Sequence, residues 1–368
     1  MLSTTAPGAA ADAARSQTPA TMRALVKARP AEGLDFDGER PVPECGPRDV
    51  RIRVRKAGIC GTDRHIWEWD DWAASRIPVG IVTGHEFVGT IESVGPAVTR
   101  YKAGQRVSAE GHITKGVDYN SRTGNAHIAS DTRILGVDRD GCFADYVVVP
   151  EENVWPLHES IPDKVAAVLD PLGNAVHTVM AAGVSARSVL ISGVGIIGLM
   201  AVTVAKAAGA GRIFATDINP PRLDLARRLG ATDAFDVREG DGWIKEVRKA
   251  CRGEGVDVLL EMSGAASAFD QGFRALRNGG TAALLGLPAK PMTFDFNTNI
   301  VFKGCTVLGI NGRRMFETWY QMEELLLSGK LELDEIITHE FPLEQYRKAF
   351  DTMRSGEGIK VVLDMGVK

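Results

Sequence analysis

The chain has 368 residues, 44% of them hydrophobic and 24% charged, with a net charge of −4 at pH 7 and a sequence pI near 6.0. That length exceeds what a single hydrophobic core usually supports, so we expect two domains. The balanced charge, with no Lys/Arg-rich stripe, gives no electrostatic basis for binding nucleic acid or an anionic membrane, and no segment reaches the roughly 20 apolar residues of a membrane span. We therefore expect a small-molecule partner.

The N-terminal residues 1–21 are rich in Ala, Ser and Thr, which predicts a disordered extension before the first domain. The cysteines are odd in number and scattered along the chain, which argues against a disulfide framework. A reducing cytoplasm fits this usage. The five cysteines stand at positions 45, 60, 142, 251 and 305.

The first part of the chain, residues 23–155, has the rhythm of β-structure. In residues 50–55 valine or isoleucine alternates with arginine, which is the period of a half-buried strand. Further short apolar runs follow, separated by glycine and proline breaks such as Gly95-Pro96. We therefore expect a compact barrel or folded sheet in this region.

From about residue 174 the pattern changes to strand then helix, repeated several times. The run SVLISGVG leads into GLMAVTVAKAAGA, RIFATD into PPRLDLARRLGA, and VDVLLEMSGA into a further helix. Strands that alternate with helices predict a parallel sheet covered on both faces. Nearer the C-terminus we expect a helix with Trp319, Met322 and Leu326 on one face, then a last strand at KVVLDM.

A glycine-rich turn lies between the first of these strands and its helix. Gly193, Gly195 and Gly198 form a G-x-G-x-x-G pattern, which suits a tight turn, close approach of a pyrophosphate, and close packing of helix on strand. Asp217 ends the next strand, where a carboxylate accepts hydrogen bonds from a ribose diol and repels a 2′-phosphate. This favours NAD over NADP, although Arg222 nearby could meet a 2′-phosphate. The alternative is a doubly wound domain with an ordinary surface aspartate.

Several other positions carry side chains suited to holding a metal at such a site. Cys60 follows the alternating strand, and His85 and Glu86 are adjacent in GHEFVG. Asp170 interrupts an apolar stretch, where an unpaired carboxylate would be costly. These are ligand types of a catalytic zinc, which keeps one position open and lowers the pKa of a bound alcohol. Each residue alone also has an ordinary explanation as a core thiol, a core histidine or a turn residue, and a nucleophilic Cys–His pair is a further alternative.

At these residues the sequence resembles a known family. The pattern GHE-x2-G-x5-G-x2-V, which starts at Gly84, is similar to the zinc signature of the medium-chain alcohol dehydrogenases. The segments ICGTDRHIWEWDDWA, SAEGHIT, DPLGNAVHTV and NGRRMFETWY resemble the L-threonine 3-dehydrogenase branch, and the similarity runs from Met22 to the C-terminus. The resemblance implies an α/β fold: a GroES-like β-barrel catalytic domain over 22–174, a Rossmann domain with a doubly wound parallel sheet over 175–313, and a segment over 314–368 that returns to the catalytic domain.

The resemblance also implies a zinc site. Its expected ligands are Cys60, His85 and Glu86. Asp170 is expected to be either a fourth ligand or a group that acts directly on the zinc-bound species. Most of the family carries a second, structural zinc held by four cysteines after the GHIT segment. Here the corresponding positions hold Lys115, Asp118, Ser121 and Ala129. A Cys₄ site cannot form, and Asp118 with His127 would not replace it, so we expect one catalytic zinc only.

The remaining roles implied by the resemblance concern protons, cofactor and substrate. Thr62 and His65 match the family's relay, which passes the alcohol's proton through the threonine hydroxyl and the cofactor ribose to the histidine. His112 is expected to line the substrate pocket. The positions expected to meet the cofactor are Gly193, Gly195, Ile197, Gly198, Asp217, Arg222, Leu285, Gly286, Leu287, Ile310 and Asn311.

The resemblance implies an NAD-dependent enzyme that oxidises L-threonine at C3 to 2-amino-3-oxobutyrate and works as a homotetramer, and the cysteine usage fits the cytoplasm. The nearest alternative is the same machinery acting on a polyol or another secondary alcohol, such as sorbitol or butanediol. A protein that binds dinucleotide without catalysis is a third reading. The intact set of metal and relay residues argues against it, because cofactor binding alone needs none of them.

Overall fold

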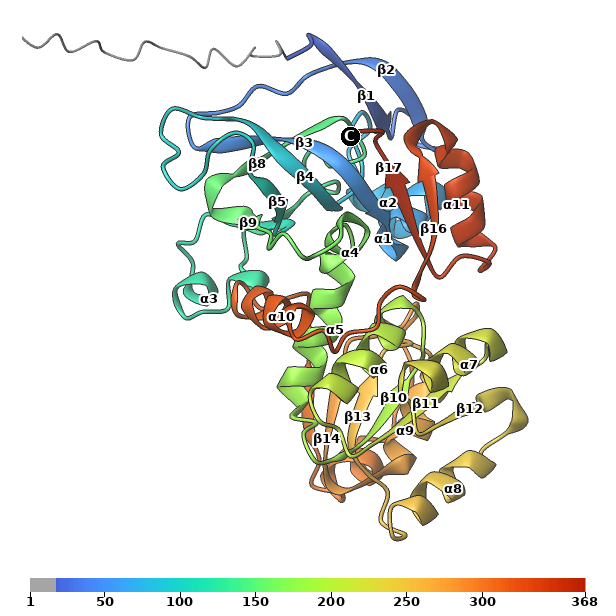
Figure 1. Ribbon diagram of the computed structural model, residues 1–368. Helices are drawn as coiled ribbons and strands as arrows, with labels where there is room; N and C mark the ends of the chain where they lie inside the picture. The colour runs from blue at the N-terminus through green and yellow to red at the C-terminus, as the bar shows by residue number, and fades with distance from the viewer. Residues whose placement is uncertain (1–17, 368) are drawn as a thin grey trace, which may run out of the picture.

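Two sheets organise the chain, and each lies in its own lobe of the molecule (Figure 1). The computed structural model describes residues 18–367. The helices α5 (Leu169–Ala182) and α10 (Glu317–Leu327) lie where the two lobes meet. The chain enters the second lobe after α5 and returns after α10, because β16 (Ile337–Pro342) and β17 (Lys360–Asp364) join the sheet of the first lobe.

The sheet of the first lobe is built on one long central strand, β3, which pairs antiparallel with β4, β8 and β17. The alternation expected in this strand is confirmed, since Val50, Ile52 and Val54 are fully buried and Arg53 is exposed. Among residues 18–367 the strand order runs as an open path from β16 to β9, so closure into a barrel stays a prediction. The strands not yet bounded are β3 (Asp49–Ile59), β4 (Glu86–Val94), β5 (Arg106–Ala109), β8 (Tyr146–Pro150) and β9 (Val154–Pro156).

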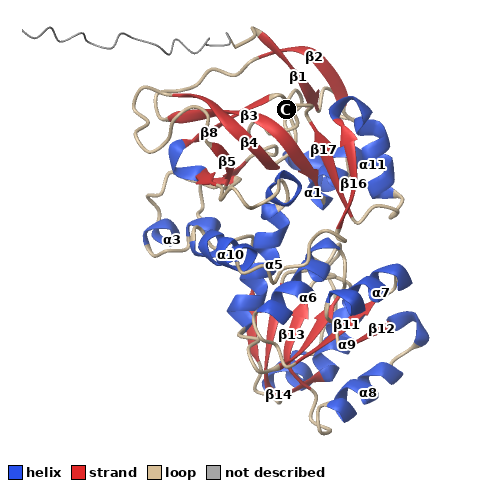
Figure 2. Cartoon of the chain, viewed as in Figure 1, coloured by secondary structure: helices blue, strands red, loops and turns tan. Residues whose placement is uncertain are grey.

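The sheet of the second lobe has six strands, all parallel, in the order β12-β11-β10-β13-β14-β15, with helices around it (Figure 2). This is the doubly wound order expected from the alternating pattern. Val189 and Ile191 of the central strand pack with α6 and α7, whereas Leu190 between them packs with α8 and α9. The elements are β10 (Ser188–Ser192), α6 (Ile196–Ala207), β11 (Arg212–Asp217), α7 (Pro220–Leu229), β12 (Asp233–Asp236), α8 (Gly242–Ala250), β13 (Val256–Glu261), α9 (Ala266–Ala275), β14 (Leu276–Leu284) and β15 (Thr306–Gly309).

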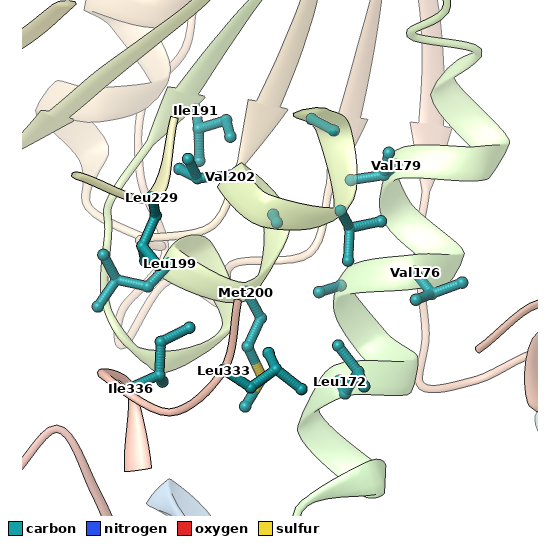
Figure 3. Packing of buried hydrophobic residues seen from close by; sticks show 14 of the residues in the cluster. Leu172, Val176, Val179, Ile191, Leu199, Met200, Val202, Leu229, Leu333 and Ile336 are labelled. Carbon is teal, nitrogen blue, oxygen red and sulfur yellow. The ribbon is translucent and has the colours of Figure 1, made fainter. Parts of the chain in front are cut away.

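One hydrophobic cluster ties the crossing segments to the second lobe. Leu172 of α5 lies near Met200 of α6 and Leu333 of the returning chain, and Val176 and Ile336 belong to the same cluster (Figure 3). All five side chains are at most 4% exposed. Full burial of such a side chain contributes about 1.5–3 kcal/mol, so this cluster holds the two lobes in a defined relation.

The other elements are short or lie at the edges. The predicted domain limits stay predictions: residue 21 is the first residue of the first strand, and residue 174 lies within α5, the helix where the two lobes meet. Residues 1–17 of the predicted extension lie outside the described residues. No helix in the described chain is long and apolar enough to cross a membrane. The remaining elements are β1 (Thr21–Val26), β2 (Asp35–Pro41), α1 (Gly61–Glu68), α2 (Asp71–Arg76), β6 (His112–Ile113), α3 (Tyr119–Arg122), β7 (Arg133–Ile134), α4 (Asp163–Ala166) and α11 (Tyr346–Arg354), with 3-10 turns at 126–128, 151–153, 237–239 and 343–345 and a π turn at 297–301.

Candidate active site

A cleft of about 570 Å³ opens between the two lobes. The first lobe contributes residues of α1 and the start of α5, and the second contributes Ile197, Leu285, Leu287 and Ile310. A larger cavity, about 740 Å³, lies beside β2 and β8, but none of the site residues expected from the sequence lines it. The cleft, not the larger cavity, is therefore where the expected chemistry is gathered.

Three donor side chains lie together beside this cleft, and one of them, His85, lines it. Antiparallel pairing sets Gly58 of β3 opposite Glu86 of β4, which brings the end of one strand beside the start of the other. Cys60, just past β3, lies with its Sγ 3.1 Å from Nε2 of His85. One donor atom from each of Cys60, His85 and Glu86 lies within 4.8 Å of the other two. Within residues 18–367 this is the one cluster of three such donors.

The chemistry of this cluster fits a metal cation. Burial raises the pKa of the Cys60 thiol and of the Asp63 and Glu86 carboxyls, because too little positive charge lies nearby to offset the lost hydration. Nδ1 of His85 is buried without a hydrogen-bond partner and faces Oδ1 of Asp63 at 4.0 Å. A thiolate, an imidazole and a carboxylate are the donor types of a catalytic zinc, with Asp63 placed to orient the histidine.

Glu86 also has a cationic partner that the sequence did not reveal. Nζ of Lys360, at the start of β17, lies 2.5 Å from Oε2 of Glu86 and donates to the carbonyl of Ile59. Lys360 is fully buried and Glu86 is only 2% exposed. The approach is close enough that a Cβ on Gly58 would lie 2.3 Å from Oε2 of Glu86, so a side chain there would displace the carboxylate. Because of this ion pair, Lys360 already balances part of the negative charge of Glu86.

Asp170 lines the cleft but stands outside the three-donor cluster. Its Oδ2 lies 2.6 Å from Nη1 of Arg313, which is itself 1% exposed. Arg313 also bonds the fully buried Glu110, to which Trp319 donates from Nε1 at 2.8 Å. Burial alone would raise the pKa of Glu110, but Arg313 and His112 more than offset it and hold that pKa well below its usual range. Glu110 therefore joins the first lobe to the returning chain.

His112 lies at the edge of this buried network and lines the cleft, as expected of a residue near substrate. Its Nδ1 is 2.9 Å from Oε1 of Glu110, and its backbone N–H donates to the same oxygen. The sequence pattern EGH contains both residues, but only the fold shows that the glutamate faces Arg313 rather than solvent. The network fixes the position of the imidazole.

The two relay candidates share one helix face. Thr62 and His65 lie three residues apart on α1, so both side chains face the same way, and both line the cleft. The backbone N–H of Thr62 donates to Sγ of Cys60 at 3.2 Å. Nδ1 of His65 lies 2.5 Å from Oδ2 of Asp70, a partner that the sequence did not indicate.

The glycine-rich turn is formed as the pattern requires. Gly193 has φ +88, a left-handed value that favours glycine, and Gly195 is the N-cap of α6. A Cβ on Gly198 would lie 2.1 Å from the carbonyl oxygen of Gly193, so helix and turn pack too closely for any side chain. Asp217, at the end of β11, accepts hydrogen bonds from the N–H groups of Val194, Ile218 and Asn219. The carboxylate is thus fixed beside the turn.

The other expected cofactor positions fall into two groups. Ile197, Leu285, Leu287, Ile310 and Asn311 line the cleft. Arg222 lies in the first turn of α7, away from the cleft wall. Gly286 is also behind the wall, where a Cβ would lie 2.2 Å from the backbone nitrogen of Gly264.

Two aspartates stabilise the segment over 112–134, which is called the lobe segment below. Asp118 accepts hydrogen bonds from the N–H groups of Ser121 and Ser130. Asp131 accepts from the hydroxyl of Thr114 and the N–H of Lys115. Asp118 stands at one of the four positions where the resemblance would place a cysteine, and Asp131 lies two residues beyond the last of them. His127 adds a packing contact, since its ring lies edge-on to that of His177 on α5, with centroids 5.5 Å apart.

The fold and the cleft together define a zinc-dependent dehydrogenase built from a substrate lobe and a dinucleotide-binding lobe. Residues 46–159 match the alcohol dehydrogenase GroES-like domain, and residues 197–328 match the zinc-binding dehydrogenase domain. The L-threonine 3-dehydrogenase of Chelativorans sp. (strain BNC1) is 48% identical over 93% of this chain and 98% of its own. The enzyme of the same name from Deinococcus radiodurans is 46% identical over 93% of this chain and 98% of its own. The chain belongs to the L-threonine 3-dehydrogenase family of the zinc-dependent medium-chain dehydrogenases.

Solved structures of similar proteins share this fold, and their names give different ligands and substrates. A zinc-binding dehydrogenase from Sinorhizobium meliloti 1021, bound to NADP, is 27% identical, has a TM-score of 0.84, and covers 94% of this chain and 100% of its own. The 2R,3R-butanediol dehydrogenase of Bacillus subtilis is 26% identical, with a TM-score of 0.85 over 94% of this chain and 99% of its own. The fold class expected from the sequence is confirmed, with a nicotinamide dinucleotide as the kind of cofactor.

Proposed function

We propose that this enzyme oxidises L-threonine at C3 to 2-amino-3-oxobutyrate, with NAD as hydride acceptor. The observation that carries the proposal is the cluster of Cys60, His85 and Glu86, which meets through His85 a cleft whose far wall belongs to the dinucleotide-binding lobe. Relatives that bear the name L-threonine 3-dehydrogenase align along nearly the whole chain, which supports this substrate over other alcohols.

The proposed metal is a single zinc, held by Cys60, His85 and Glu86. Asp170, which lines the same cleft and is paired with Arg313, is proposed either as a further ligand or as a group that acts on the zinc-bound species. When bound, zinc would act as a Lewis acid that favours ionisation of the substrate hydroxyl. Lys360 limits how far Glu86 is free to move, because the two side chains are paired in a buried site. The aspartates of the lobe segment leave no need for a second, structural zinc.

The chain's own residues handle the proton, the substrate and water. Thr62 would accept the hydroxyl proton at the cleft, and His65 would carry it outward to solvent. His112, held by Glu110, would contact the substrate. The apolar side chains of Ile197, Leu285 and Ile310 in the far wall would exclude water from the hydride-transfer region.

The choice of NAD rests on Asp217, whose carboxylate is fixed at the end of β11. A carboxylate there repels a 2′-phosphate, whereas Arg222 lies in the next helix and could attract one. We expect tighter binding of NAD than of NADP. Asp217→Ala should narrow that difference, and equal affinities in the unaltered enzyme would contradict the proposal.

A second candidate function is oxidation of a diol or polyol on the same machinery, which the likeness to the butanediol dehydrogenase favours. The two are separated by the rate of NADH formation from L-threonine, 2,3-butanediol and sorbitol. A large preference for L-threonine in kcat/KM supports the first proposal, and a preference for a diol supports the second.

We also propose that the enzyme works as a homotetramer in the cytoplasm, with domain limits near residues 174 and 313. Membership of the family supports the assembly and location. The return of β16 and β17 to the first sheet supports the division into domains. Sedimentation of the purified protein tests the assembly directly.

A further inference from the structure

The proton released by the substrate hydroxyl needs a route to solvent, and His65 is well placed at its outer end. The histidine lines the cleft, yet its side chain is 56% exposed. One ring nitrogen can therefore meet a proton from the cleft while the imidazole remains in reach of water. For this transfer to work, the ring must keep one orientation and one tautomer.

The backbone between α1 and α2 brings a carboxylate onto this ring. Trp69 has a left-handed backbone with φ 54 and donates its N–H to the carbonyl of His65, which ends α1 and reverses the chain. Asp70 is thereby folded back over the helix, with Oδ2 2.5 Å from Nδ1 of His65. Its other oxygen, Oδ1, accepts the N–H of Ala73 at 3.0 Å as the N-cap of α2. Each carboxylate oxygen thus has its own partner.

One further contact restricts the pair. The ring of Trp72, also in the cleft wall, meets the ring of His65 edge-on, with centroids 5.9 Å apart. Partial burial would raise the pKa of Asp70, but hydrogen bonds from the Ala73 N–H and from His65 outweigh it and lower that pKa. The group beside Nδ1 is therefore an ionised carboxylate, which can only accept a hydrogen bond.

We propose that Asp70 is a positioning residue for the proton relay, acting through His65 on the function proposed above. By accepting Nδ1–H it leaves Nε2 as the bare nitrogen that receives the proton. As hydride leaves the carbinol carbon for NAD⁺, the hydroxyl proton passes by way of Thr62 to Nε2 of His65. Water then removes it, so the products are the ketone, NADH and one proton. Asp70 keeps the imidazolium oriented and balances its charge, and is not itself protonated.

The competing explanation is that Asp70 only caps α2. Two substitutions separate the roles: Asp70→Asn and Asp70→Ser both retain a good N-cap, but neither places a carboxylate on Nδ1. We expect kcat to fall about 10–100-fold in each, which is the usual range for loss of such an orienting partner, with the KM for alcohol and cofactor changed less than about twofold. Asp71→Asn is the matched control, because Asp71 is the adjacent exposed acid, and it should leave kcat unchanged.

A double-mutant cycle with His65→Asn tests whether the effect passes through the histidine. If Asp70 acts only through His65, Asp70→Asn should change kcat less than about twofold in the His65→Asn background. An equal loss in both backgrounds, or no loss in the single variants, would overturn the proposal.

The cycle is run with the best alcohol of the substrate panel. A substrate other than L-threonine would then overturn the proposed function while the cycle still decides the role of Asp70. An enzyme that oxidises no alcohol would overturn both.

Discussion

The acidic side chains of the donor cluster beside the cleft have raised pKa values, whereas those of the lobe segment over 112–134 have lowered pKa values. In the cluster, burial raises the pKa of Cys60 and Glu86, because the lost hydration outweighs the opposing effects of His85 and Lys360. In the lobe segment, hydrogen bonds from Ser121 lower the pKa of Asp118, and one from Thr114 lowers that of Asp131. The first arrangement suits a cation and the second is complete without one, which is a physical reason to expect zinc in one place and not in the other.

The largest effect should come from removing the thiolate of the cluster. Zinc acting as a Lewis acid supplies several kcal/mol of transition-state stabilisation, so Cys60→Ser should lower kcat/KM on the order of 1000-fold or more while NAD still binds. Initial rates and zinc content by mass spectrometry measure this. Cys305→Ser is the control, since Cys305 lies in the second lobe with its Sγ on the carbonyl of Asn299. Unchanged turnover in Cys60→Ser would remove Cys60 from the metal site.

Breaking the Lys360–Glu86 pair should produce the next largest effect. Lys360→Met leaves a buried carboxylate without its partner, which costs about 3–5 kcal/mol of unfolding free energy. Added zinc should recover part of this loss, because the cation replaces the missing charge. Urea unfolding with and without zinc measures both. The control is Lys56→Met, whose partners Glu340 and Asp364 are partly exposed, and it should cost about 1 kcal/mol or less. Equal losses at both lysines would contradict the account of Glu86.

The lobe segment should respond to its aspartate and not to chelators. Asp118→Ala removes the N-cap of α3 and the bond to Ser130, so we expect a loss of about 1 kcal/mol and faster proteolysis within 112–134. Treating the unaltered enzyme with a zinc chelator should abolish activity but leave the rate of cleavage in this segment unchanged. If chelation opened the segment, a metal would have to hold it after all.

The smallest effect concerns pH and His127. Burial, together with His177 and other nearby cations, lowers the pKa of His127 to about 4. The unfolded histidine binds a proton below about pH 6.5 and the folded one only below about pH 4, so stability is lost as pH falls between these values. His127→Gln should therefore weaken the pH dependence of unfolding over that interval. If His127→Gln leaves the pH dependence of unfolding unchanged, His127 is solvated in the folded enzyme.

The sequence was a good guide to residues that carry chemistry themselves. Strand alternation predicted the buried face of β3, and the glycine pattern with Asp217 predicted the turn that the fold displays. Cys60, His85 and Glu86 were expected together through the resemblance, and the strand pairing of β3 with β4 brings them together. Asp170 was expected near the metal, but the structure pairs it with Arg313, and its part in zinc binding stays a prediction.

The charged residues that pair with these side chains could not be predicted from the sequence in the same way. Lys360 and Arg313 reach the site from the chain that returns after the second lobe, and no local pattern links a late strand to the cluster beside β4. Glu110 reads as a polar residue at a strand end until the fold sets Arg313 and Trp319 against it. Nothing in the sequence links Asp70 to His65, because their contact depends on the left-handed turn at Trp69.

The most direct test of the account is to titrate zinc into metal-free enzyme while following NADH formation from L-threonine and NAD. We predict that activity starts near zero, rises linearly, and stops rising at one zinc per subunit. Activity without zinc, or a rise that continues to two zinc ions per subunit, would contradict the assignment of a single zinc to the cluster of Cys60, His85 and Glu86.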